Sequence, residues 1–121
     1  MRKTVSIVAL GALVALAVAV SALGARSTGS ATPQKVTVGM SEFKFAITPK
    51  TVKKNVPVAF ALTNKGTIGH DFKIGGKKSP VLAAGKKGTL TVTFKKAGRY
   101  PYLCTLPSHA AAGMKGVIVV K

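Results

Sequence analysis

The sequence of 121 residues is long enough for one domain with a modest core, and its 19 Lys and Arg against 2 Asp and Glu give a formal net charge of +17. The only carboxylate side chains are Glu42 and Asp71, so the sequence offers no evident acid/base pair and does not favour an enzyme. Its lysines occur as scattered pairs without a basic helix or an aromatic RNA-reading motif, which argues against nucleic-acid binding.

Residues 1–24 have the features of a signal peptide. Arg2 and Lys3 provide a positive start, residues 5–20 are apolar, and small residues precede a cleavage point after Gly24. An uncleaved membrane anchor is the alternative, because the apolar segment approaches the length needed to span a bilayer. Either interpretation predicts an exported protein, located in the periplasm, on the outer face of the cytoplasmic membrane or outside the cell.

Residues 25–34 are rich in Ser, Thr, Gly and Pro and show no apolar periodicity, so we expect a flexible linker. The folded domain is then expected to cover residues 35–121. Short strand candidates separated by turn signals follow, without a segment of helical period. The strands are expected near 35–40, 43–47, 51–54, 56–63, 70–74, 89–94, 99–104 and 117–121, and residues 77–85 are expected to be irregular.

Alternation of apolar and polar residues is clearest at 56–63 and 89–94, and Met40 is expected in the core. Seven to eight short strands of this kind predict an all-β fold, either a β-sandwich or a barrel.

Three potential metal ligands occur on one short loop near the C-terminus. Cys104, His109 and Met114 are spaced five residues apart between the last two expected strands, and His70 begins an earlier strand. A thiolate, two imidazoles and a weak thioether form the ligand set of a blue-copper electron-transfer site. The sequence therefore predicts one copper ion bound by these four residues.

Each of these residues also has an ordinary explanation. A single cysteine at a strand end is often a small buried hydrophobe, a methionine can simply pack, and a histidine can be hydrogen-bonded. Zinc is a weaker alternative, because a thioether is a poor zinc ligand. Metal coordination would, however, engage a thiol that has no partner for an internal disulfide.

Several stretches resemble small bacterial cupredoxins of the plastocyanin/azurin family. They are HDF at 70–72, AGRYPYLCTLPSHAAAGMKG at 97–116 and the closing VIVV, with weaker likeness in EFKF and LTNKG. The resemblance implies a two-sheet Greek-key β-sandwich and one-electron transfer. It also implies that His70, Cys104 and His109 bind copper in a plane, with Met114 as the axial ligand.

Two positions depart from the family pattern. Asp71 stands where many members have Asn, and Ser108 stands where the family often has Gly. An ionised Asp71 can accept hydrogen bonds but cannot donate them, and its charge could lower the reduction potential.

We therefore expect an exported, monomeric type 1 copper protein that carries single electrons and is not an enzyme. His109 would be the exit point for the electron, within an apolar patch of Leu106, Pro107 and residues 110–112. The cationic surface predicts an acidic redox protein or an anionic envelope surface as partner, with membrane contact only through an uncleaved N-terminal segment. A copper carrier or buffer of the envelope is the alternative function, and a domain of a larger oxidase or reductase is a third.

Overall fold

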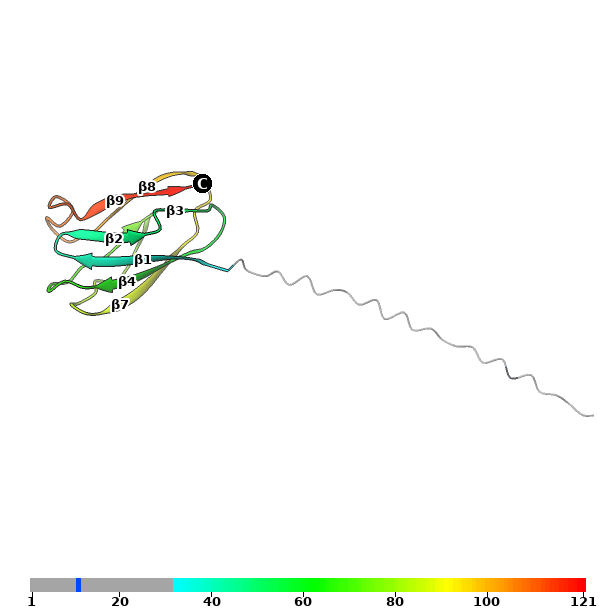
Figure 1. Ribbon diagram of the computed structural model, residues 1–121, viewed down its shortest axis with the longest axis horizontal. Coiled ribbons are helices and arrows are strands. Elements are labelled where there is room, and N and C mark those ends of the chain that lie inside the picture. The colour runs from blue at the N-terminus through cyan, green and yellow to red at the C-terminus, as the bar shows by residue number, and fades with distance from the viewer. Residues whose placement is uncertain (1–10, 12–31) are drawn as a thin grey trace, which may run out of the picture.

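The computed structural model describes residue 11 and residues 32–121 (Figure 1). Apart from residue 11, the predicted signal peptide lies outside the described residues, as does most of the predicted linker. Among the described residues, nine strands form two sheets, which confirms the predicted all-β sandwich and exceeds the seven to eight strands expected. The strands are β1 (Gln34–Ser41), β2 (Lys44–Thr48), β3 (Thr51–Val52), β4 (Val58–Asn64), β5 (Lys73–Ile74), β6 (Lys77–Lys78), β7 (Lys87–Val92), β8 (Gly98–Leu103) and β9 (Lys115–Val120).

The two sheets are built from strands that alternate along the chain. One sheet has the order β2-β1-β4-β7 and the other has the order β3-β9-β8-β5-β6. Neighbouring strands are antiparallel except for the β1–β4 and β3–β9 pairs, which are parallel. Because the chain passes repeatedly between the sheets, the arrangement is a Greek-key sandwich with one core between two layers. Within the described part of the chain, no helix is long and apolar enough to cross a membrane.

The core follows from the alternation that the sequence shows. In β4, Val58, Phe60 and Leu62 are buried while the residues between them are only partly covered. Met40 is also fully buried, as predicted. Side chains of a strand point alternately to opposite faces, so one face of β4 fills the space between the sheets.

Aromatic rings connect the two layers. Phe72 lies 5.1 Å from Phe60 of the first sheet and 5.6 Å from Tyr102 of the second, measured between ring centroids. Phe45 of β2 also contacts Tyr102, with centroids 5.4 Å apart and the rings nearly perpendicular. Edge-on and tilted pairs of this kind stabilise a core beyond the area that they bury.

One predicted segment differs from the structure. The strand expected at 70–74 is reduced to β5, and the region expected to be irregular contains β6, which pairs with β5. Gly75 and Gly76 have φ values of 56° and 75°, which permit the tight turn between them. The two residues of β6 are exposed lysines, so no apolar alternation marked it in the sequence.

The loops that carry the predicted ligands lie at one end of the sandwich, opposite the C-terminus (Figure 1). At this end β1 turns into β2, β4 ends, and the chain passes from β8 to β9. We call it the metal end, and define it by residues 41–44, 64–71, 81–82 and 104–115.

Replacing Phe60 with alanine is expected to lower the free energy of unfolding by about 3–5 kcal/mol, because a fully buried ring is lost and its neighbours cannot close the cavity. Thr89→Ala, at an exposed position of β7, is the control and should change stability by less than about 0.5 kcal/mol. Urea denaturation of the metal-free protein measures both. Equal effects of the two changes would contradict the assigned core.

Candidate metal centre

Three predicted ligand residues bring their donor atoms together at the metal end. His109 Nδ1 lies 3.3 Å from His70 Nδ1 and 3.4 Å from Cys104 Sγ. The three donor atoms all lie within 4.8 Å of one another. Donor atoms that share one ion at about 2.0–2.3 Å are separated by about 3–4 Å, so the cluster has the size of a metal site. The donor set, one soft sulfur and two imidazoles, fits copper.

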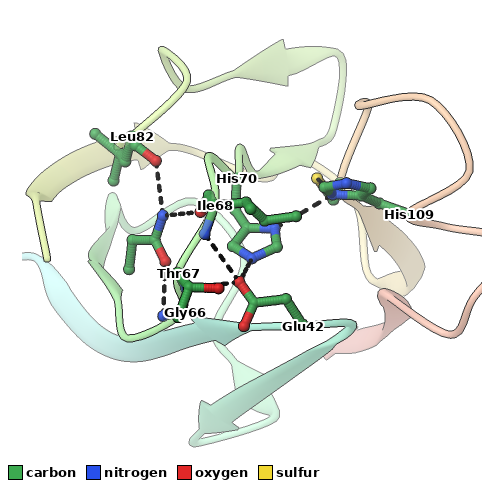
Figure 2. Close-up of polar contacts among 9 residues, drawn as sticks. Glu42, Gly66, Thr67, Ile68, His70, Leu82 and His109 are labelled. Atoms are coloured by element: carbon green, nitrogen blue, oxygen red, sulfur yellow. Dashed lines mark hydrogen bonds and ion pairs between the residues drawn. The ribbon is translucent and has the colours of Figure 1, made fainter. Parts of the chain in front are cut away.

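The predicted ligand residues differ in their access to solvent. His70, Cys104 and Met114 are buried, whereas His109 is only half-buried. The donor cluster is therefore closed to water on the core side and approaches the surface at His109. Figure 2 shows the two imidazoles pointing toward each other from different segments of the chain.

Backbone hydrogen bonds fix the loop between β8 and β9. The N–H of Cys104 donates to the carbonyl of Met114 at 3.1 Å, and the N–H of Met114 donates to the carbonyl of His109 at 3.1 Å. Gly113 has a φ of 116°, which allows the chain to turn into Met114. The three predicted ligands of this loop are thus bonded to one another through the main chain, and Met114 is held next to the cluster with its side chain buried.

The backbone at Ser108 explains why glycine suits this position. Its φ is 67°, in the left-handed region that glycine adopts without cost and that other residues adopt with strain. The carbonyl of Ser108 accepts a hydrogen bond from the N–H of Ala112 at 3.0 Å, which keeps the turn closed. Ser108 therefore adopts here a backbone conformation that a glycine would adopt without strain.

His70 is held by a second set of contacts. Its N–H donates to the carbonyl of Leu82 at 3.1 Å, and the N–H of Leu82 donates back to the carbonyl of His70 at 2.8 Å. The buried amide of Asn64 donates to the carbonyls of Ile68 and Leu82 at 2.8 and 2.7 Å. Asn64 therefore connects the end of β4 to the segments of Ile68 and Leu82, which flank His70.

Asp71 joins the segment of His70 to the segment of Cys104. Its carboxylate is buried, and Oδ1 accepts a hydrogen bond from the N–H of Thr105 at 2.6 Å. Its other oxygen accepts a bond from the Thr105 hydroxyl. Both bonds need only an acceptor, so an ionised Asp71 can make them without the amide donor of an asparagine.

Burial also changes the chemistry of the thiol. Desolvation raises the pKa of Cys104, and the nearby Asp71 carboxylate opposes the negative thiolate further. The metal-free protein therefore holds a neutral thiol at neutral pH, and metal binding must release its proton.

Glu42 is a functional candidate that the sequence interpretation did not assign. Its Oε1 accepts hydrogen bonds from the N–H groups of Thr67 at 2.7 Å and Ile68 at 3.1 Å, and lies 3.1 Å from His70 Nε2 (Figure 2). The bonds from Thr67, Ile68 and His70 lower the pKa of Glu42 to about 2. The rarity of carboxylates in so basic a chain was the one signal in the sequence that could have drawn attention to it.

A family profile described as "Cupredoxin-like domain" matches residues 9–120. The "copper-resistant cuproprotein CopI" of Rubrivivax gelatinosus is 30% identical, over 59% of this chain and 56% of that protein. Rusticyanin of Acidithiobacillus ferrooxidans is 41% identical, over 54% of this chain and 45% of that protein.

The chain thus spans about half the length of these curated relatives. Among solved structures, auracyanin B superposes with a TM-score of 0.63 and 24% identity, over 74% of this chain and 91% of that chain. This structural likeness concerns the fold.

Replacing Asp71 with alanine is expected to lower the free energy of unfolding by about 1–3 kcal/mol, because the backbone N–H and the hydroxyl of Thr105 both lose the buried carboxylate that accepts from them. Asp71→Asn keeps one carbonyl oxygen and should lose less. Lys73→Gln, a nearby exposed change, serves as the control. Urea denaturation of the metal-free protein should show the largest loss of stability in Asp71→Ala, a smaller loss in Asp71→Asn and the smallest in Lys73→Gln. An Asp71→Ala variant as stable as Lys73→Gln would contradict the link between the two segments.

Proposed function

The chain belongs to the cupredoxin-like family, and we propose that it is a type 1 copper protein that carries single electrons between redox partners. The observation that carries the proposal is the convergence of His70 Nδ1, Cys104 Sγ and His109 Nδ1 at one end of the sandwich. We propose that Met114, buried on the same loop as Cys104 and His109, would supply a fourth, weak thioether ligand. Copper fits this family and this donor set, and when bound it supplies a Cu(I)/Cu(II) couple.

The protein's own contribution is to hold the donors still. Strand ends, the bonded loop from Cys104 to Met114 and the Asp71–Thr105 link fix the donor atoms before any metal enters. Buried Cys104, His70 and Met114 also keep water from the core side of the site. A fixed, dry site of soft donors needs little rearrangement between two oxidation states, which favours fast electron transfer. The same four-donor site leaves little room for a substrate, so we propose no catalytic activity for this chain.

The surface around His109 supports docking of a partner. Among the described residues, the exposed large apolar side chains are Phe43, Ile68 and Val81, and all three belong to the metal end. The ring of Phe43 contacts the imidazole of His109 edge-on, with centroids 5.0 Å apart. Half-buried Leu106 and exposed Pro107 belong to the same loop as His109, so we propose that apolar side chains of the metal end surround the most exposed ligand where a partner would approach it.

Charge supports an acidic partner. The two carboxylates of the chain, Glu42 and Asp71, both accept hydrogen bonds at the metal end, so the rest of the described side-chain surface carries only positive formal charge. A long-range positive field would speed encounter with an acidic redox protein or an anionic envelope surface. The apolar segment at residues 5–20 supports export, and we place the domain outside the cytoplasm.

The visible spectrum tests the site directly. Adding Cu(II) to the protein is expected to produce an intense blue band from charge transfer between the Cys104 sulfur and copper, and Cys104→Ser should abolish it. The serine variant should keep the fold, since it differs by one buried atom, and circular dichroism checks this. A colourless wild-type protein would remove the basis of the electron-transfer proposal.

Salt dependence tests the partner class. Reduction by an anionic reagent such as hexacyanoferrate(II) should slow steeply as ionic strength rises, because salt screens the attraction to the cationic surface. Oxidation by a cationic cobalt(III) complex should instead speed up as salt screens repulsion. Stopped-flow measurements give the rate of each reaction as a function of ionic strength. Rates that do not change with ionic strength for either reagent would contradict electrostatic steering.

A copper carrier or buffer of the envelope is the second candidate function, favoured by the similarity to a protein described as a copper-resistant cuproprotein. The two functions differ in what leaves the site. Repeated oxidation and reduction without metal loss supports the electron carrier, whereas ready hand-over of Cu(I) to an acceptor protein supports the copper carrier.

A further inference from the structure

The turn between β1 and β2 lies against the loop that carries His109 and reaches the donor cluster there. Glu42 and Phe43, two consecutive residues of this turn, each contact one of the two imidazoles. Phe43 lies against His109, and Glu42 bonds to His70 through Nε2, the nitrogen that does not face the other donors. Figure 2 shows Glu42 between the loop at Gly66 to Ile68 and the ring of His70.

The carboxylate of Glu42 is itself fixed. The same oxygen that meets His70 accepts the N–H groups of Thr67 and Ile68, so the bond to the imidazole cannot shift without breaking two others. Gly66 makes room for it, because a Cβ at that position would collide with the carboxylate. The loop at residues 66–68 therefore provides both the space and the hydrogen-bond donors that the Glu42 carboxylate needs.

A neutral imidazole carries one N–H, on either Nδ1 or Nε2. A carboxylate beside Nε2 accepts that N–H and leaves the lone pair of Nδ1 free. In His70, Nδ1 is the atom that lies 3.3 Å from His109 Nδ1 and belongs to the donor cluster. The contact therefore selects the tautomer that can bind a metal and fixes the plane of the ring.

We propose that Glu42 is a positioning residue for the metal site. It holds His70 in the Nε2–H tautomer, with Nδ1 toward the metal, and places a fixed negative charge behind this ligand. The inference rests on the proposed role of His70 as a metal ligand. Sequence spacing could not reveal it, since 28 residues separate the two side chains.

The charge has a consequence beyond orientation. The two backbone N–H groups that donate to Glu42 favour the charged form of its carboxylate. A negative charge bonded to a ligand stabilises the more highly charged Cu(II) over Cu(I), and a carboxylate also increases the basicity of the imidazole that donates to it. Glu42 therefore biases the site toward the oxidised state.

Three variants of the full chain separate orientation from charge. Glu42→Gln keeps an acceptor oxygen and removes the charge, whereas Glu42→Ala removes both. Gly66→Ala keeps the charge but pushes the carboxylate away from His70, and its φ lies outside the left-handed region, so alanine suits the backbone. Thr51→Lys is the matched control, because it makes the same change in net charge at an exposed position of β3, away from the metal end.

The first measurement needs no copper. Nitrogen-15 NMR at about pH 8, where imidazole is ordinarily neutral, reports the tautomer of His70. We expect one tautomer, Nε2–H, in the wild type, Thr51→Lys and Glu42→Gln, and a mixture in Glu42→Ala and Gly66→Ala. Unchanged tautomers in the last two variants would overturn the positioning role, whether or not the protein binds copper.

The second measurement uses copper. Competition with chelators is expected to show about tenfold weaker Cu(II) binding in Glu42→Ala and Gly66→Ala than in Thr51→Lys. In Glu42→Gln, the ratio of Cu(II) to Cu(I) affinity should fall relative to the same control. Affinities equal to those of Thr51→Lys in all three variants would overturn the inference. A wild type that forms no blue complex would instead contradict the proposed function, and the tautomer measurement still decides the role of Glu42.

Discussion

The hydrogen bonds that Thr105 donates to the carboxylate of Asp71 connect the two segments of chain that carry the predicted metal donors, and the geometry of the site depends on them. One segment contains His70 and the other begins at Cys104, and the two are 34 residues apart in the sequence. Because the carboxylate is buried, its bonds compete with little water and hold the segments at a fixed separation. The main-chain bonds of the loop from Cys104 to Met114 then place the remaining donors relative to Cys104.

The arrangement depends on carboxylate side chains, of which the sequence has only two. In a protein of net charge +17, both carboxylates lie at the metal end and accept backbone N–H groups there. The core contributes rigidity of another kind, since the rings of Phe72 and Tyr102 pack between the sheets and Phe72 follows Asp71 directly. Rigid strands and bonded loops together leave the half-buried ring of His109 as the part of the cluster nearest to solvent.

The sandwich fold and the cluster of predicted ligands could be predicted from the sequence, because both are indicated by patterns among residues that are near one another in the chain. Alternation in β4 marked its buried face, and the five-residue spacing of Cys104, His109 and Met114 placed them on one loop. The pairing of β5 with β6 depends on glycine φ values rather than on apolar pattern, so it was missed. The contact of Glu42 with His70 arises only when distant segments meet in the fold, and nothing in the local sequence encodes it.

The entry of β1 and the exit of β9 lie at the same end of the sandwich. Gln34 bonds to the backbone of Lys53, and the neighbouring Lys54 donates its N–H to the carbonyl of Lys121. A tether joined at either place, such as a fused domain, a membrane segment or a linker to an electrode, therefore leaves the metal end uncovered. For a tethered redox pair, the length of the tether would then set the effective concentration of one site near the other, and with it the rate of electron exchange.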